Sequence, residues 1–380
     1  MMNEKTLGLY IHIPFCKAKC AYCDFYSLAG ADERMDAYLN ALGVQLEAFA
    51  QNAAGYVVDT VYLGGGTPSY LGAARLRRIL EAVRRDYRVA PDAEITLEAN
   101  PDSVGEWFAE LRAAGFNRAS LGVQSAAPAL LRAVGRVHTV EQSSRAVEQI
   151  RRAGFENLSL DFIYGLPGES AEQWRQSIEY ALTLGPEHLS CYGLKIEPGT
   201  PLHRRRESLI LPDDDAQAER MLWAVETLAR HGFRQYEVSN FAKPGRESRH
   251  NLKYWTLGEY LGFGPGAHSD FKGTRFAWAR DLDAFLRESQ MRNWTRAESA
   301  PIAPRERSRE WLMLGLRTAD GVSLDEYRAR FGREFDADFL RQCRRAGYAR
   351  ERAGRFSLTA RGFLVSNLII GRVLELAERP

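Results

Sequence analysis

Apolar and polar positions follow two different periods along the first half of the chain. Short apolar runs, which are typical of buried strands, alternate with longer segments that carry an apolar residue every three or four positions, as amphipathic helices do. The expected strands cover residues 7–13, 60–63, 94–98, 118–123, 157–163 and 188–194. The expected helices cover residues 32–54, 71–87, 107–114, 140–153 and 171–184. This alternation predicts six parallel strands with right-handed crossover helices, which curl into a barrel or part of one.

The pattern changes in the second half of the chain. An amphipathic helix is expected over 212–231, residues 235–241 extend the sheet, and 243–273 is rich in glycine and aromatic residues. Beyond Pro301, arginine-rich helices are expected at 304–316, 324–331 and 335–346, followed by a hairpin around Gly354 and a last helix from residue 360. The predicted fold class is α/β. It combines a partial (β/α)6 barrel over 1–235, a barrel extension and connector over 236–300, and a C-terminal winged-helix-like α-rich domain over 301–380.

Three of the five cysteines lie within eight residues, as Cys16, Cys20 and Cys23 with C-x3-C-x2-C spacing. Structural zinc takes four protein ligands, and a cubane iron–sulfur cluster normally takes four cysteines. No second pair of cysteines exists, because Cys191 and Cys343 are isolated. The spacing therefore favours a cluster with three ligated irons and one iron open to a non-protein ligand, over a zinc knuckle or a disulfide knot.

Composition narrows the class of protein. The chain has 45% hydrophobic and 26% charged residues and a net charge of +2, which are ordinary values for a globular protein and give no reason to expect nucleic acid as a partner. The first residues lack the apolar core of a secretory signal, and no stretch is apolar enough to span a bilayer. We expect a cytoplasmic protein.

Polar residues gather at one end of the predicted strands. Tyr10, the run 64–68, Glu98, Gln124 and Asp161 each lie in or just beyond the C-terminal half of a strand. In α/β barrels this edge of the sheet holds the functional site. The sequence therefore places these residues beside the cysteines.

The cysteine spacing, with Tyr22 directly before the third cysteine, resembles that of the radical S-adenosylmethionine (SAM) superfamily. The motifs at 10–16, 64–68, 121–124 and 161–167 are similar to those of its coproporphyrinogen-dehydrogenase-like branch. The resemblance implies a radical SAM barrel in which Cys16, Cys20 and Cys23 hold a 4Fe-4S cluster. It also implies that one or two SAM sites are lined by Tyr10, Tyr22, Gly65, Gly66, Thr67, Glu98, Gln124, Arg136 and Asp161.

Two departures point away from the dehydrogenase itself. It carries a further cysteine where this chain has Phe25, and its N-terminal arm is longer than the nine residues before Tyr10. Both features favour the sister group, the HemW-type heme chaperones. The segment 249–255 also resembles that group's H-N-x-x-Y-W pattern, which implies heme binding by His250. His268 is a second candidate, and His12 is expected to be structural.

The resemblance implies a chaperone that binds heme and delivers it to an acceptor such as a respiratory enzyme or a membrane-associated complex. The alternative is an enzyme of porphyrin metabolism, the oxygen-independent coproporphyrinogen III dehydrogenase. A nucleic-acid-binding role for the arginine-rich C-terminal module is disfavoured, because such a face is usually solvated or used for docking. The sequence leaves the oligomeric state open, with a dimer on cluster binding as one option.

Overall fold

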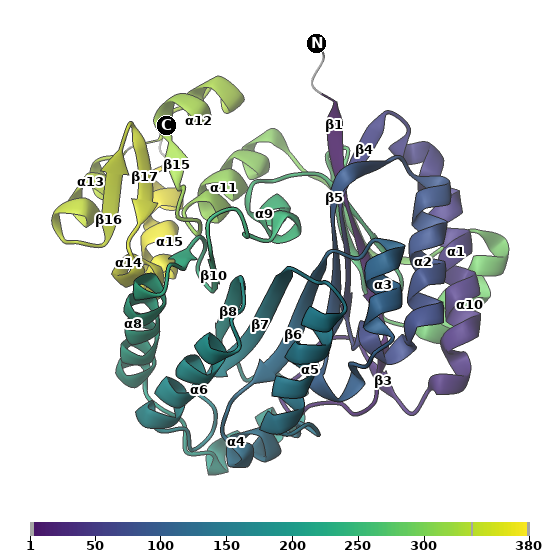
Figure 1. Ribbon diagram of the computed structural model, residues 1–380. Helices are drawn as coiled ribbons and strands as arrows, with labels where there is room; N and C mark the ends of the chain where they lie inside the picture. Colours follow the sequence, from purple (N-terminus) through teal and green to yellow (C-terminus); the bar gives the residue numbers. More distant parts are fainter. Residues whose placement is uncertain (1–3, 336, 378–380) are drawn as a thin grey trace.

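The computed structural model describes residues 4–335 and 337–377, and it confirms the α/β class (Figure 1). Its main sheet has 12 strands in the order β14-β13-β12-β11-β1-β4-β5-β6-β7-β8-β10-β9. The six predicted parallel strands form its centre. They are β1 (Lys5–Ile13), β4 (Tyr56–Gly65), β5 (Val89–Ala99), β6 (Arg118–Gln124), β7 (Asn157–Tyr164) and β8 (His188–Gly193). The sheet curls without closing, so it is a partial barrel.

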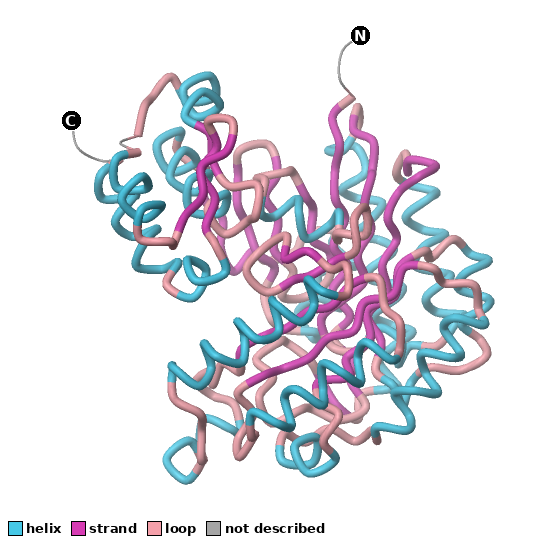
Figure 2. The backbone as a smooth tube through the Cα atoms, turned by 60° about the vertical axis from the view of Figure 1, so that its left-hand side comes forward, coloured by secondary structure: helices cyan, strands magenta, loops and turns pink. Residues whose placement is uncertain are grey.

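The crossover helices cover the convex face of the sheet, as Figures 1 and 2 show. They are α1 (Met35–Ala50), α2 (Ala73–Asp86), α3 (Phe108–Ala114), α5 (Val140–Arg152) and α6 (Ala171–Thr183). Strand β1 illustrates why these layers form: Leu7, Leu9, Ile11 and Ile13 are fully buried in the core between the sheet and the helices. Since side chains alternate along a strand, the intervening positions face the inside of the barrel. That inner face carries the polar residues.

The segment from 234 to 301 adds strands to both edges of the sheet, which the sequence predicted only for one of them. Strands β10 (Asn240–Ala242) and β9 (Arg234–Gln235) extend the edge at β8. At the other edge, β11 (Tyr260–Phe263) pairs in parallel with β1. Three antiparallel strands follow it, β12 (His268–Phe271), β13 (Thr274–Trp278) and β14 (Arg296–Pro301), with α10 (Leu282–Met291) packed on α1.

The C-terminal segment has its own core, which runs from Leu312 to Val373. It forms a group of elements at one corner of the molecule (Figure 2). Its elements are α11 (Pro304–Gly315), β15 (Val322–Ser323), α12 (Leu324–Phe331), α13 (Asp338–Arg345), β16 (Ala349–Arg352), β17 (Arg355–Leu358), α14 (Ala360–Leu364) and α15 (Ser366–Leu376). The expected last helix is thus two helices, which meet at Val365. Within the described residues, no helix is both apolar and long enough to cross a membrane.

Candidate functional site

The three clustered cysteines lie on the loop that follows β1. The short strand β2 (Phe15–Cys16) pairs with β3 (Leu28–Ala29), and this pairing closes the loop at its base. The backbone of Ala21 fastens the middle of the loop: its N–H donates to Val134 O at 3.0 Å, and its carbonyl accepts from Leu202 N at 2.8 Å. The loop therefore keeps one shape although its tip faces solvent.

All three thiols are free, and each has a different environment. Cys16 is buried, whereas Cys20 and Cys23 are partly exposed. Thr67 Oγ1 donates to Cys16 Sγ, and Arg136 Nη1 donates to Cys20 Sγ, each at 3.5 Å. Burial raises the pKa of the Cys16 and Cys23 thiols. Burial thus disfavours the thiolate, and a bound metal offsets this effect because it holds a cysteine as the thiolate.

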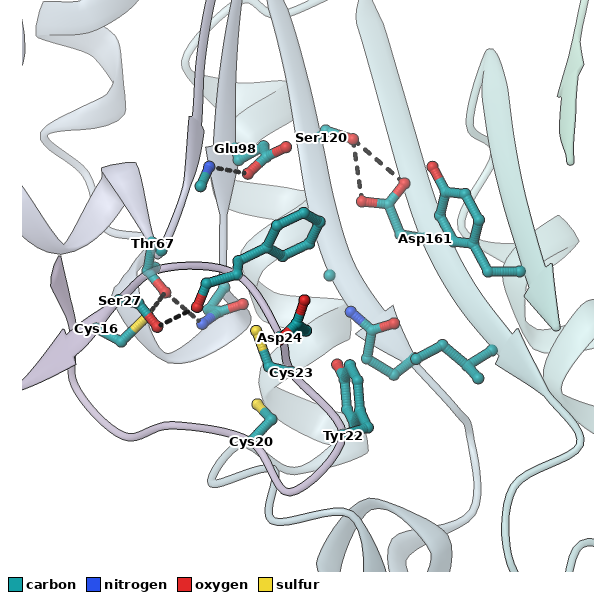
Figure 3. A pocket seen from close by; sticks show the side chains of 18 of the residues that line it. Cys16, Cys20, Tyr22, Cys23, Asp24, Ser27, Thr67, Glu98, Ser120 and Asp161 are labelled. Atoms are coloured by element: carbon teal, nitrogen blue, oxygen red, sulfur yellow. Dashed lines mark hydrogen bonds between the residues drawn. The ribbon is translucent and has the colours of Figure 1, made fainter. Parts of the chain in front are cut away.

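The cysteines suit a cluster better than a single ion. Among residues 4–335 and 337–377, no three His, Cys, Asp or Glu side chains are placed to hold one metal ion. A cubane gives each cysteine its own iron, so the sulfurs need not converge on one point. Figure 3 shows Cys16, Cys20 and Cys23 around one end of a pocket. Hydrogen bonds to sulfur, such as those from Thr67 and Arg136, affect the reduction potential of such clusters.

The glycine run at the end of β4 packs directly against the start of the cysteine loop. Gly66 N donates to Ile13 O, and Thr67 N donates to Phe15 O, both at 2.8 Å. A Cβ on Gly66 would lie 2.6 Å from Phe15 O, so no larger residue fits there. Gly65 has a φ of 111°, which glycine adopts readily. These glycines bring the backbone close to the cysteines.

Glu98, at the end of β5, is the most strongly perturbed carboxyl group beside the glycine run. It accepts hydrogen bonds from Tyr62 Oη at 2.8 Å and from Gly65 N at 3.1 Å. Burial, with a smaller contribution from the negative charge of Asp161, raises its pKa to about 7, although both hydrogen bonds act in the opposite direction. Glu98 can therefore change its protonation state near neutral pH.

A polar network connects the strand ends to the cysteines. Arg136 Nη2 donates to Asn100 Oδ1 and to Gly122 O, both at 2.7 Å. Asn100 Nδ2 donates to Thr67 Oγ1 at 3.0 Å, so the network reaches Cys16 as well as Cys20. The sequence analysis missed Asn100, although its place two residues after Glu98 at the end of a strand was a signal.

Two further predicted residues lie on neighbouring strands of the inner face. Gln124 ends β6 with a φ of 68°, which is uncommon for a residue other than glycine. The carboxylate of Asp161 on β7 accepts from Ser120 Oγ at 3.1 and 3.2 Å and from Ser159 Oγ at 3.3 Å. Burial raises the pKa of Asp161, and these hydroxyls and Ser190 counteract the rise. Ser120 and Asp161 are seen together in Figure 3.

One pocket, which we call the barrel chamber, collects most of these residues. Its volume of about 560 Å³ is in the range of small-molecule sites. The predicted residues that line it are Cys16, Cys20, Tyr22, Cys23, Gly65, Gly66, Thr67, Glu98, Gln124, Arg136 and Asp161. The chamber is also lined by Asn251 of the H-N-x-x-Y-W pattern and by residues that were not predicted from the sequence, among them Asn100, Arg118, Ser120, Ser190 and Tyr192.

Tyr10 and His250 do not line the chamber. Tyr10 Oη is hydrogen-bonded to His12 Nδ1 at 3.1 Å, and His12 Nε2 to Tyr26 O at 2.7 Å. Burial lowers the pKa of His12 to about 4, so this ring is neutral and structural, as expected. The Tyr10 ring stacks on Tyr62, which does line the chamber. Tyr10 therefore supports the chamber wall from behind.

His250 is buried at the opposite end of the barrel, on α9 (Arg249–Trp255), and only 1% of it is exposed. Its Nδ1 is hydrogen-bonded with Thr60 Oγ1 and its Nε2 with Tyr254 Oη, each at 2.8 Å. Burial, together with the positive charges of Lys253 and Arg118, lowers its pKa to about 3. His250 is thus neutral, and both ring nitrogens are occupied. His268 begins β12 on the surface, away from the chamber.

Known proteins resemble this chain in sequence over almost its whole length. Residues 10–181 match the Radical SAM superfamily, and residues 302–365 match the HemN C-terminal domain. The chain is 35% identical over 372 residues to the heme chaperone HemW of Bacillus subtilis, across 96% of this chain and 98% of that protein. The chain belongs to the HemW family of radical SAM proteins. The HemW protein of Mycobacterium tuberculosis is 44% identical over 281 residues, which is 72% of either chain.

The fold of this HemW-family protein also matches a solved structure. The structure titled "Coproporphyrinogen III oxidase (HemN) from Escherichia coli is a Radical SAM enzyme" superposes with a TM-score of 0.84 over 97% of this chain and 90% of that one. The two sequences are 23% identical, so this similarity shows the fold alone. The predicted radical SAM barrel with a C-terminal module is therefore confirmed.

Proposed function

We propose that this HemW-family protein is a heme chaperone, which binds heme, a 4Fe-4S cluster and SAM and delivers the heme to an acceptor protein. The observation that carries the proposal is similarity along almost the whole chain to a protein named as a heme chaperone. The segment Arg249–Trp255, with the H-N-x-x-Y-W pattern, supports the heme site. The acceptor would be a heme-binding protein such as a respiratory enzyme.

Cys16, Cys20 and Cys23 would hold the cluster, because three free thiols line one end of the chamber and no other cysteine of the described residues lines it. A bound cluster would supply one iron with no protein ligand. SAM would lie against Gly65, Gly66 and Thr67, where it would also contact Glu98, Gln124, Arg136 and Asp161. In this arrangement Glu98 accepts a hydrogen bond from an amine or a ribose hydroxyl. Tyr22 covers the cysteine end, and Tyr10 supports Tyr62.

Heme would bind through the imidazole of His250, which suits this role because it is neutral. Before a ring nitrogen can bind iron, it must give up its hydrogen bond to Tyr254 or to Thr60. Heme loading therefore requires α9 to move or Tyr254 to rotate. After such a change, Tyr254 and Trp255 can pack on the face of the porphyrin.

The test is an anaerobic reconstitution of the wild type and of His250→Ala, followed by titration with heme and measurement of the Soret band. His268→Ala is the matched control, because His268 is exposed and lies outside the chamber. We expect saturable binding in the wild type and in His268→Ala, and its loss in His250→Ala. Equal binding in all three proteins would remove His250 as the ligand.

The same preparation separates the chaperone from the dehydrogenase. We expect no protoporphyrinogen when the reconstituted protein is incubated with coproporphyrinogen III, SAM and a reductant. Formation of protoporphyrinogen would refute a role limited to heme transfer. Transfer itself is tested by mixing the heme-loaded protein with an apo-protein acceptor and following the Soret band of each after separation.

A further inference from the structure

Arg118 lies deep in the barrel chamber, far from the cysteines. It begins β6, whereas Gln124 ends the same strand near Arg136. A strand rises about 3.3 Å per residue, so the two ends of β6 lie about 20 Å apart. Asn251 of α9 lines the same chamber. We call the part around Arg118 and Asn251 the floor of the chamber, and the part around the cysteines its cluster end.

The guanidinium group of Arg118 has no hydrogen bond or ion pair with any of the residues that the structure describes, although the residue is only 1% exposed. Its Nε is completely enclosed and has no acceptor. A buried arginine is normally paired, since its charge and its five N–H groups are costly to bury alone. Arg136, in the same chamber, donates to three acceptors. Arg118 therefore has donor capacity that faces the chamber and is not used.

Nearby carboxylates keep Arg118 charged without binding it. Burial lowers its pKa, but the surrounding groups, of which Glu94 has the largest effect and Asp161 a smaller one, raise it above its usual value. Glu94 uses both oxygens to accept from the backbone N–H groups of Arg249 and His250, each at 3.0 Å. Asp161 accepts from serine hydroxyls. The surrounding groups thus keep Arg118 positively charged, and its N–H groups remain available to a ligand.

We propose that Arg118 binds a carboxylate group of a ligand at the floor of the chamber, and that this carboxylate is a propionate of heme. The planar guanidinium fork matches a carboxylate in a two-point contact. A SAM molecule that places its carboxylate at the cluster cannot also place it on Arg118, because one carboxylate cannot occupy both ends of the chamber. Another carboxylate-bearing ligand must supply it.

The position of His250 argues for heme. The ring of Tyr62 lines the chamber and stacks on the ring of His250, with 5.2 Å between the centroids. Asn251, the next residue after His250, also lines the chamber. Iron on His250 and a propionate on Arg118 would then be two contacts of one ligand at the same floor. This inference rests on the proposed function, because it assumes that the protein binds heme.

The test compares heme with heme dimethyl ester, in which both propionates are blocked, on the reconstituted protein in excess SAM. We expect the wild type to bind heme about tenfold more tightly than the ester, since a hydrogen bond to a charged group contributes about this factor. We expect Arg118→Gln to bind both compounds as weakly as the wild type binds the ester. Arg280→Gln, a change at another arginine of the chamber lining, is expected to keep the wild-type ratio.

The outcomes separate this inference from the function on which it rests. If the wild type binds neither compound, the heme function itself is wrong. If it binds both equally, or if Arg118→Gln keeps the preference for heme, Arg118 does not bind a propionate although heme binding stands. Competition between added SAM and heme would assign the carboxylate to a second SAM and overturn the assignment to heme. If Arg118→Gln does not fold, Arg118→Lys is expected to retain only part of the preference, and a full wild-type preference in Arg118→Lys would overturn the assignment.

Discussion

The two ends of the barrel differ in how ready they are to receive a ligand. At the cluster end, the cysteines are free, glycines expose the backbone, and Glu98 and Arg136 already point into the chamber. Beside the floor, His250 is enclosed and its two ring nitrogens are hydrogen-bonded within the protein. A ligand at the cluster end meets side chains that already line the chamber. Heme at His250 must replace internal hydrogen bonds, each of which contributes about 1 kcal/mol.

This difference suggests that the two ends act in different ways. The cluster end resembles a preorganised cofactor site, in which second-shell donors fix the ligands before the cofactor arrives. His250 resembles a site that is closed until a ligand shifts a conformational equilibrium. The rings of His250 and Tyr62 and the carboxylate of Glu98 form a continuous path between the two ends. Substitutions along this path and at its two ends test whether the two ends differ in this way.

The largest effect is expected at the cluster end. Cys20→Ser should abolish the visible absorption of the reconstituted cluster and most of the bound iron, because the site has no spare cysteine, while the fold remains. Cys343→Ser, in the separate C-terminal core, should keep both. The iron content and the absorption spectrum of each variant measure how much cluster it binds. Full iron and an unchanged band in Cys20→Ser would remove the ligand assignment.

The next effect concerns the protonation of Glu98. Its folded pKa of about 7 means that it is largely protonated at pH 6 and ionised at pH 8. If the ionised form binds SAM, affinity should rise with pH up to about 7, by as much as about tenfold per pH unit below that value, and then level off. Isothermal titration from pH 5.5 to 8 measures this.

Glu98→Gln should flatten this profile, because an amide does not titrate in this range. Glu237→Gln is the matched control: burial also raises the pKa of Glu237 to about 7, but Glu237 does not line the chamber. The control should keep the slope. A flat profile in the wild type would show that the protonation state of Glu98 does not affect SAM binding.

A smaller effect is expected from Tyr254→Phe, which removes one of the two hydrogen bonds to the His250 ring. If internal hydrogen bonding keeps His250 closed, the variant should bind heme about fivefold more tightly, since about 1 kcal/mol of competing interaction is lost. Tyr260→Phe is the control, because Tyr260 packs edge-on against Tyr254 without contacting His250 through its hydroxyl. Unchanged or weaker binding in Tyr254→Phe would contradict a closed heme site.

The smallest effect tests the path between the two ends. The hydroxyl of Tyr62 lowers the pKa of Glu98, so Tyr62→Phe should raise that pKa and move the midpoint of SAM binding upward by about half a pH unit. Tyr10→Phe should leave the midpoint in place, because Tyr10 Oη is hydrogen-bonded to His12 instead. A shift of equal size in both variants would indicate a general loss of packing.

Much of this architecture could be predicted from the sequence because its signals are local. Six strands and their crossover helices follow from the period of apolar residues, and the cysteine spacing marks the loop after β1. Strands β11 to β14 were missed, because short antiparallel strands in a segment rich in glycine and aromatic residues carry no clear period. The helix expected from residue 335 begins only at Asp338.

The candidate site likewise contains residues that the sequence predicted and residues that it did not. Sequence motifs indicated the residues at the cluster end, since each motif lies where a strand ends, and 11 of them line the chamber. Arg118 was not recognised, because an arginine at the start of a strand usually faces solvent. Its burial arises only when β5, α9 and β7 close around it and bring Glu94 and Asp161 near. The closed state of His250 likewise depends on Thr60, 190 residues earlier in the chain.

Periodicity and spacing in the sequence predicted the six central strands, the cysteine loop and the family, because these signals act over short stretches of chain. Which inward-facing side chains meet depends on the tertiary structure. Alternation along a strand tells which face a residue occupies, but its partner across the barrel depends on register, curvature and the segments added at both edges of the sheet. The unused donors of Arg118 and the satisfied ring of His250 are consequences of those contacts.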